Sequence, residues 1–437
     1  MAFARIAVRH PLPPPQPVAS VAEVSFCHPG YEPPHDILFK LPRLDQQLAS
    51  PPPSGTVSAV KGIHYGTALA ACQIAANNAF DGYLATDRSG HDRLNCPFDG
   101  VLTGHKYWFF TTSQVGTSQQ PYPVVPSFQD WMFPHQAYHS ESDHGHDHEH
   151  GDTVSCVSHW HEPPPILSGR CIVTQTSGLV QSAHIIPSVD REWFERNAMS
   201  QYGTHHDIDQ SANTVDFRND IHAAFDDHWF AIVPKAGDYT IHQLVAAKVS
   251  AREFADTYHG LPVLGRGQGP ASGDACISRE FLYARFARAV LLLLKPFVAQ
   301  SAVRRRVARY RSKSEVQGDG EVEDNSTSGP RLDVEWLSPE QLHRDYSGGG
   351  TRSASPSKRK RGSGEDDDTD GEDDEEQLGG FRETQKPVII DDSLEDEERG
   401  RPRKRRFLGD GDTKRDLTPP HSHASSTSRS SLCTMLH

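Results

Sequence analysis

The stretch NTVDFRNDIHAAFDDHWFAIVPK, residues 213–235, decides how the middle of the chain is expected to fold. Its pattern predicts a short helix over about 217–227, followed by an aromatic and β-branched strand over 229–233. Positions i and i+4 share one face of a helix, so His222 and Asp226 would stand side by side. A His and an Asp are also common on an ordinary solvated helix face. The sequence upstream is needed to decide between a functional pair and an ordinary solvated helix face.

The upstream segment RCIVTQTSGLVQSAHIIPS, residues 170–188, contains two short β-rich runs around a TSG turn. We expect CIVT (171–174) and AHII (183–186) to be strands, with His184 near the end of a hairpin. A loop of about 25 residues then leads to Asn213. Taken singly, His184 would suit a protein core and Asn213 a turn or a cap. The order strand, turn, strand with His, loop, Asn and helix with His is the layout of a ββα-metal finger.

Composition sets the broad class of protein. The 437 residues allow two or three domains, and the net charge of −14 argues against a protein that coats nucleic acid along its whole length. Seven cysteines without a CxxC pair suit a reducing compartment. The start of the chain lacks the apolar core of a signal peptide, and the apolar run 281–298 is interrupted by charged residues. We expect a soluble intracellular protein without a membrane span, and its oligomeric state stays open.

The predicted fold class is α+β, with a central ββα finger flanked by other modules. Ser278 is the expected N-cap of a long helix over 278–310, which ends in the basic run VRRRVARYR. An acidic tail with the run EDDDTDGEDDEE should be disordered. The expected order is a Pro-rich, largely irregular segment (1–55), a small α+β module (56–135), a His- and acid-rich linker (136–164), the ββα-metal domain (165–245), a helical extension (246–311) and a disordered tail (312–437).

Four motifs in this chain resemble the HNH (His-Asn-His) endonucleases, and most closely a fungal group of HNH-domain proteins. They are CIVT (171–174), AHIIPS (183–188), NTVDFRNDIHAAFD (213–226) and FAIVPK (230–235). The segments GYLATDRSG and REFLYARFARAV extend the resemblance over roughly 60–300.

The resemblance implies metal-dependent hydrolysis of nucleic acid phosphodiester bonds, with DNA favoured over RNA as the substrate. His184 would be the general base, because an imidazole with a pKa near neutrality can take a proton from water. His222 would bind a divalent ion, with Asp226 completing the ligand set, and Asn213 would hold the loop or lend its oxygen to the metal. Mg²⁺ or Mn²⁺ would suit such a site, with Zn²⁺ as the alternative.

The chain departs from the family pattern at two points, of which the first favours a rival interpretation and the second predicts that no zinc knuckle is present. Many active relatives carry a metal ligand immediately before the first His, and this chain has Ala183 there. It also lacks the CxxC pairs that bind structural zinc in many relatives, although Cys171 could join Cys156, His159 and His161 at a zinc site. The rival is a catalytically inactive HNH fold that binds nucleic acid or protein.

The tail contains three candidate recognition elements. The basic clusters KRKR and RPRKRR resemble nuclear import signals that would bind importin, or they could contact phosphates. A short β-branched run followed by acidic residues resembles a SUMO-interacting motif, which would add a strand to its partner's sheet. These elements predict a nuclear protein. The import candidates are Lys358, Arg359, Lys360, Arg361, Arg403, Lys404, Arg405 and Arg406. The candidates for binding SUMO are Val388, Ile389 and Ile390.

Overall fold

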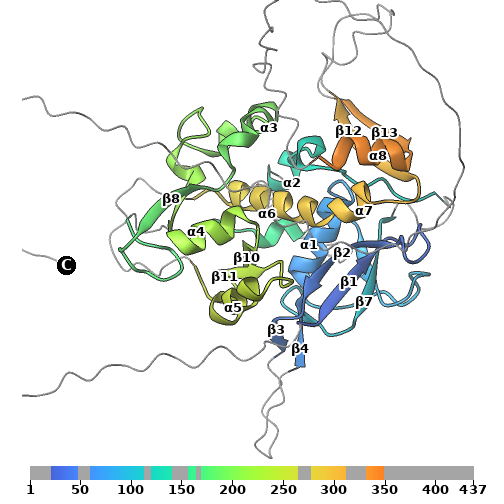
Figure 1. Cartoon of the computed structure of the whole chain (residues 1–437), viewed down its shortest axis with the longest axis horizontal. Coiled ribbons are helices and arrows are strands. Elements are labelled where there is room, and N and C mark those ends of the chain that lie inside the picture. The colour runs from blue at the N-terminus through green and yellow to red at the C-terminus, as the bar shows by residue number, and fades with distance from the viewer. Residues whose placement is uncertain are drawn as a thin grey trace, which may run out of the picture. The chain divides into compact units, whose positions relative to one another are not determined.

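The computed structural model describes residues 21–47, 60–112, 120–139, 156–163, 169–263, 277–311 and 331–348. All of them belong to one compact unit, residues 1–357, which mixes helices with several small sheets (Figure 1). The α+β class is therefore confirmed. The import candidates between Lys358 and Arg406 and the SUMO candidates Val388 to Ile390 lie outside the described residues and stay predictions. Across the described ranges, the helices are too short or too polar to cross a membrane.

The N-terminal part is built from two small sheets. The larger has the strand order β2-β1-β7-β5, with β1 parallel to β7 and the other neighbours antiparallel. Its strands are β1 (Glu23–Cys27), β2 (Ile37–Pro42), β5 (Tyr83–Ala85) and β7 (Lys106–Phe110). The smaller has the order β3-β4-β6 and consists of β3 (Asp45–Gln47), β4 (Val60–His64) and β6 (Val101–Leu102).

The prediction of a largely irregular segment over residues 1–55 is wrong for β1, β2 and β3. Val24, Phe26 and Leu41 in these strands are fully buried. The strands owe their stability to pairing with partners far along the chain, such as β1 with β7. The prolines that dominate the local composition do not reveal such distant pairing.

The helices α1 (Tyr65–Ala75) and α6 (Arg279–Leu293) lie together in the core. α1, which the sequence predicts, packs against α6, and α6 also packs against β10 (Phe230–Lys235). Most side chains of α6 are buried, as expected for a helix in the interior of a protein, although Leu292 near its end is exposed. Ser278 caps α6 by accepting a hydrogen bond from the Phe281 amide, which confirms the predicted N-cap.

The helix predicted to run to residue 310 ends much earlier. A short helix, α7 (Lys295–Ala299), follows α6 and has a proline in its first turn. The basic run then forms β12 (Arg305–Arg311), which pairs antiparallel with β13 (Arg331–Leu337), and α8 (Pro339–Tyr346) follows. β13 and α8 also correct the prediction that disorder begins at residue 312. β13 packs against β12 and α8 packs against α7, contacts that are not apparent from the local composition.

Two arginines of β12 make structural contacts. Arg305 is buried and donates from Nη1 to the His35 carbonyl (2.8 Å) and from Nε to the Phe297 carbonyl (3.1 Å). Arg309 pairs with Glu335 of β13 at 3.0 Å. The run that looks like a basic surface in the sequence therefore ties β12 to its neighbours.

The central region differs from its prediction in strand pairing. β8 (Val180–His184) pairs with β9 (Thr214–Arg218), and residues 171–174 form a turn closed by the Gln175 amide to the Cys171 carbonyl (2.7 Å). The β-branched residues of CIVT are thus packed without being in a strand. Phe217 and Arg218 belong to β9, so the helix begins only at Asn219. The other elements here are α2 (His135–His139), α3 (Arg191–Arg196), α4 (Asn219–Asp226), β11 (Asp238–Gln243), which pairs with β10, and α5 (Val249–Tyr258).

His28 makes stability depend on pH. It is fully buried, donates from Nε2 to the Tyr122 carbonyl and accepts at Nδ1 from the Gly30 amide. Burial lowers the pKa of His28 to about 3, so the unfolded chain binds a proton first as the pH falls below about 6.5. The contribution of His28 to stability is complete above pH 6.5 and decreases by about 1.4 kcal/mol per pH unit toward pH 3.

Replacing His28 by Gln should therefore flatten the pH dependence of the free energy of unfolding. Urea denaturation at pH 7.5 and pH 5 should show a loss on acidification that is about 2 kcal/mol smaller in His28→Gln than in the wild type. Other buried histidines affect both proteins equally. The same loss in both proteins would contradict a neutral, buried His28.

Candidate nuclease site

The candidate site is built on two antiparallel strands and the helix that follows them (Figure 1). In the pairing of β8 with β9, His184 lies opposite Thr214 and Ala183 opposite Val215. Successive side chains of a strand point to opposite faces, so Gln181 and Ala183 share one face of β8 and His184 lies on the other. α4 begins directly after β9 and carries His222 and Asp226 one turn apart.

His184 is the last residue of β8 and remains about one-third exposed. Its Nε2 donates a hydrogen bond to Asp209 Oδ1 at 2.8 Å. The other oxygen of Asp209 accepts from Arg191 Nη2 at 3.0 Å, and Arg191 also pairs with Asp207. Whenever the imidazole is neutral, the carboxylate holds its proton on Nε2 and leaves Nδ1 with its lone pair.

Asn213 lies at the end of a single 3₁₀ turn (Ser211–Asn213) and is fully buried. Its side-chain oxygen accepts from the Ile186 amide at 2.8 Å. Its side-chain nitrogen donates to the carbonyls of Ile186 (3.0 Å) and Ile208 (2.8 Å). Asn213 therefore fastens the segment after His184 to the loop that contains Asp209, which favours the loop-holding role over metal coordination.

His222 contacts an oxygen on each side of its ring. Nε2 lies 3.3 Å from Asp226 Oδ2 on the same helix, and Nδ1 lies 3.3 Å from Gln181 Oε1 on β8. The Asp226 carboxylate is mostly exposed, whereas the His222 side chain is mostly covered. Ala183 on the same strand face is buried and has no donor or acceptor in its side chain.

Two arginines of α6 support this motif from behind. Arg285 is fully buried, donates from Nη2 to the Phe225 carbonyl near the end of α4, and lies 3.9 Å from the centre of the Phe225 ring. Arg288 pairs through Nε with the buried carboxylate of Asp190 at 2.6 Å, just before α3. The ends of α4 and the start of α3 are therefore fixed by a helix that follows them in sequence.

His184, Asn213, His222 and Asp226 are recognisable in the sequence as one group, whereas three neighbouring residues are not. Asp209, Arg191 and Gln181 were not singled out. The polar loop HHDIDQ contained a signal for Asp209, since a His general base commonly needs an acceptor for its second nitrogen. Gln181 gives no such signal, because its contact with His222 depends on the pairing of β8 with β9.

Comparison with known protein families locates a family match on the same elements. Residues 167–233 match a family model described as an HNH endonuclease, a range that includes β8, β9, α4 and part of β10. This match supports an HNH-domain protein and indicates a nuclease-like domain that acts on nucleic acid. No curated protein and no solved structure gives a match to the chain.

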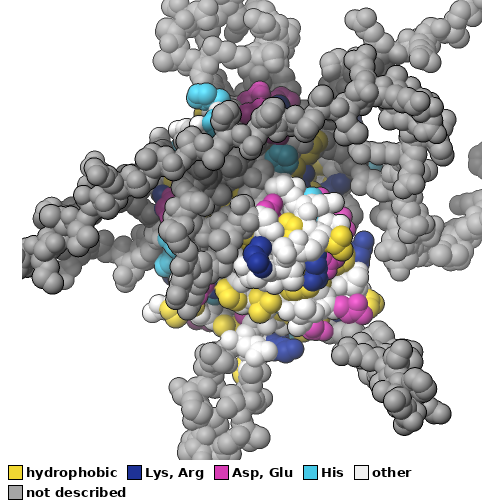
Figure 2. Space-filling model, turned by 90° about the vertical axis from the view of Figure 1, so that its left-hand side faces the viewer, with side chains coloured by type: hydrophobic (Ala, Val, Ile, Leu, Met, Phe, Trp, Pro, Cys, Tyr) yellow, Lys and Arg dark blue, Asp and Glu magenta, His cyan; other side chains and the backbone are white. Residues whose placement is uncertain are grey.

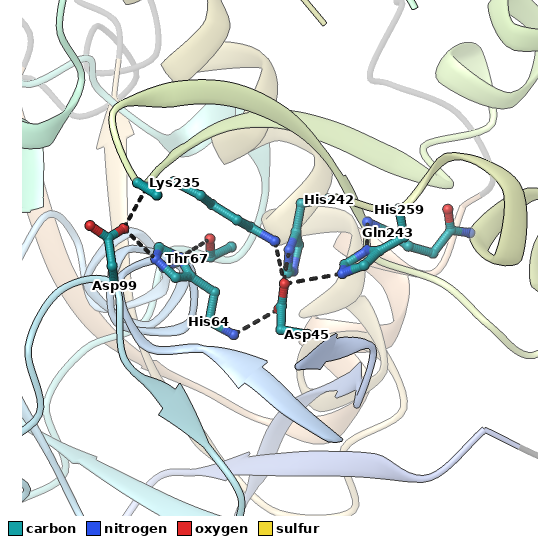
Figure 3. Close-up of polar contacts among 9 residues, drawn as sticks. Asp45, His64, Thr67, Asp99, Lys235, His242, Gln243 and His259 are labelled. Carbon is teal, nitrogen blue, oxygen red and sulfur yellow. Dashed lines mark hydrogen bonds and ion pairs between the residues drawn. The ribbon is translucent and has the colours of Figure 1, made fainter. Parts of the chain in front are cut away.

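A different set of residues forms the one group of three potential metal ligands within the described ranges. Asp45 of β3, His242 of β11 and His259 after α5 bring their ligand atoms within 4.8 Å of one another. Figure 3 shows that Lys235 points toward the same carboxylate, which also accepts from the backbone amide of His64. The His64 ring instead contacts Thr67 and Asp99. The group contains neither Cys171 nor His159 nor His161, and the side chain of Cys156 lies outside the described residues.

The contacts of Asp45 argue for an ion pair in place of a metal centre. Oδ1 accepts from Lys235 Nζ (2.6 Å) and His259 Nε2 (3.1 Å), and Oδ2 accepts from the His64 amide (2.8 Å). The backbone N–H of Gln243 donates to His259 Nδ1 at 3.1 Å, so a neutral His259 carries its proton on Nε2. Nε2 is also the atom that would have to bind a metal. Lys235 already supplies the positive charge.

This ion pair is nearly removed from water, and the carboxylate stays ionised. The side chains of Asp45 and Lys235 are each only 11% exposed. Burial raises the pKa of the Asp45 carboxyl, but Lys235, His259 and His242 more than offset this and hold that pKa well below its usual value. The pair joins β3 to the β10–β11 hairpin, which immediately follows β8, β9 and α4, the ββα elements of the candidate site.

Replacing Asp45 by Asn should destabilise the protein because it leaves Lys235 buried without a counter-charge. We expect the free energy of unfolding to fall by about 3–5 kcal/mol, measured by urea denaturation. The exposed Glu23→Gln on β1 is the matched control and should have little effect. If Asp45, His242 and His259 hold no metal, any shift of the thermal midpoint caused by Zn²⁺ or EDTA should be the same in the wild type and in His242→Ala. A midpoint that rises with Zn²⁺ and no longer does so in His242→Ala would instead establish a metal centre.

Proposed function

We propose that this protein is a metal-dependent HNH endonuclease that hydrolyses phosphodiester bonds of nucleic acid, with DNA as the first substrate to test. The observation that carries the proposal is the state of His184. It ends β8, is accessible to solvent and has its Nε2 proton held by Asp209. The family match to residues 167–233 supports the same reaction class.

In this proposal His184 acts as the general base through Nδ1. It would take a proton from water while the water oxygen forms a bond to phosphorus and the bond to the leaving alkoxide breaks. The leaving oxygen then takes up a proton from solvent. Asp209 is a positioning residue in this scheme, because it accepts the Nε2 proton and orients the ring. Arg191, paired with Asp209, supplies positive charge beside the base.

His222 and Asp226 fit a divalent cation. Their Nε2 and Oδ2 atoms lie 3.3 Å apart, close to the separation of two ligands that are each about 2.1 Å from one ion. Ala183 adds no ligand, so water and substrate oxygens would complete the coordination, as Mg²⁺ and Mn²⁺ commonly accept. When bound, the ion would stabilise charge on the phosphate and on the departing oxygen.

A second candidate function, a catalytically inactive binding module, is favoured by charge as well as by Ala183. Residues 167–233 contain four arginines and nine carboxylates, an excess of five negative charges that opposes binding of a polyanion. On the face shown in Figure 2, basic side chains of the described residues lie among acidic and hydrophobic ones. Nucleic acid binding that depends on divalent ions would fit the enzyme, and binding of a protein partner would fit the inactive module.

The proposal is tested by incubating the full-length chain with supercoiled plasmid in Mg²⁺, Mn²⁺, Zn²⁺ or EDTA. Wild type should nick the plasmid only with a metal, and His184→Ala should reduce the rate by about 10²–10⁴-fold, as expected for loss of a general base. The full chain is needed because β1–β3 and β12–β13 belong to the same compact unit. Identical traces for both proteins under every metal would reject the nuclease function on this substrate.

Asp209→Asn should separate orientation of the base from metal binding. An amide can donate to His184 and favour the wrong tautomer, so we expect the nicking rate to fall by about 10–100-fold with Mn²⁺ affinity unchanged. Asp207→Asn, which keeps the contact between His184 and Asp209, is the control and should change the rate much less. Equal effects of the two substitutions would show that Asp209 acts only through its negative charge and does not orient the His184 ring.

A further inference from the structure

The two nitrogens of His222 cannot both donate to their oxygen neighbours while the ring is neutral. Nδ1 faces Gln181 Oε1 and Nε2 faces Asp226 Oδ2, each at 3.3 Å. A neutral imidazole carries one proton, so one nitrogen donates and the other presents a lone pair. The partner that receives the proton decides whether the other side of the ring can bind a cation.

The amide of Gln181 offers an oxygen to Nδ1, and an amide oxygen can only accept a hydrogen bond. With the proton on Nδ1, the lone pair of Nε2 faces the carboxylate of Asp226. Two electron-rich atoms at this separation repel each other unless a positive charge lies between them. The contact with Gln181 therefore favours the form of His222 that can bind a metal together with Asp226.

We propose that Gln181 is a positioning residue for the divalent-ion site: when the ion occupies the side of Nε2 and Asp226, Gln181 accepts the proton of His222 on Nδ1 and directs Nε2 toward the ion. This inference rests on the proposed metal-dependent function. Because side chains alternate along β8, Gln181 shares the strand face of Ala183, and of these two side chains Gln181 is the one with polar atoms. A contact from outside the ligand set thus supports His222 where Ala183 provides no ligand.

The choice of an uncharged amide has a physical consequence. A carboxylate at position 181 would hold the same proton more strongly and make Nε2 a better donor to a metal. An aliphatic side chain would leave Nδ1 without an acceptor and free the proton to move to Nε2, where Asp226 would accept it. Metal affinity should therefore follow the acceptor strength of residue 181.

The test measures Mn²⁺ binding to the full-length protein by electron paramagnetic resonance, without an activity assay. Relative to wild type, Gln181→Leu should bind Mn²⁺ about 10–100-fold more weakly, the usual effect of losing a contact that orients a ligand. Gln181→Glu should bind more tightly than wild type, which a purely structural role would not produce. His222→Ala should lose the site.

Ser182→Ala is the matched control, since Ser182 is adjacent on the opposite face of β8 and hydrogen-bonds Asp216. It should bind Mn²⁺ as the wild type does, and circular dichroism should show that all variants are folded. If wild type binds Mn²⁺ through His222 but Gln181→Leu binds equally well, the positioning role is wrong and the proposed function stands. If wild type binds no Mn²⁺, the metal site itself fails and this inference fails with it.

Discussion

The buried pair of Asp45 and Lys235 is the interaction on which the arrangement of the candidate site depends. Asp45 is on β3 and Lys235 ends β10, the strand that follows the ββα elements. Such a charge pair is costly to desolvate, and it persists here because His259 and the His64 amide complete the contacts of the carboxylate. The ββα elements are thus joined to strands formed by the first 47 residues and are not an independent module.

The parts of the molecule that follow from neighbouring residues were predictable from the sequence. The spacing of Asn213 and His222 and the helical neighbours His222 and Asp226 are local patterns, and the cap at Ser278 is equally local. Strand partners were not predictable, because β8 pairs with β9 across more than 25 residues while CIVT (171–174) forms a turn. The contacts of Gln181 and Asp209 depend on these partners, and so they emerge only with the structure.

The candidate site combines features that favour catalysis with features that oppose it. An accessible His184 has a fixed tautomer, and His222 and Asp226 have the separation that suits a cation. Against this, Ala183 gives no ligand and the surrounding segment is acidic. Both sets are compatible with an enzyme whose substrate and metal enter together, because the substrate phosphate would supply oxygens to the ion and the ion would offset the negative surface.

Residues in and near the N-terminal strands bond partners that lie far along the chain, and this has a consequence during synthesis in the cell. His259, which bonds Asp45, comes 214 residues later, and Arg305, which bonds the His35 carbonyl, comes 270 residues later. At about 5–20 residues per second, a ribosome needs roughly 10–50 s to make that length of chain. During this interval β2 has emerged without α7, which packs against it, and Asp45 without Lys235 and His259. The N-terminal strands therefore gain their last contacts only after the nuclease-like domain has been synthesised.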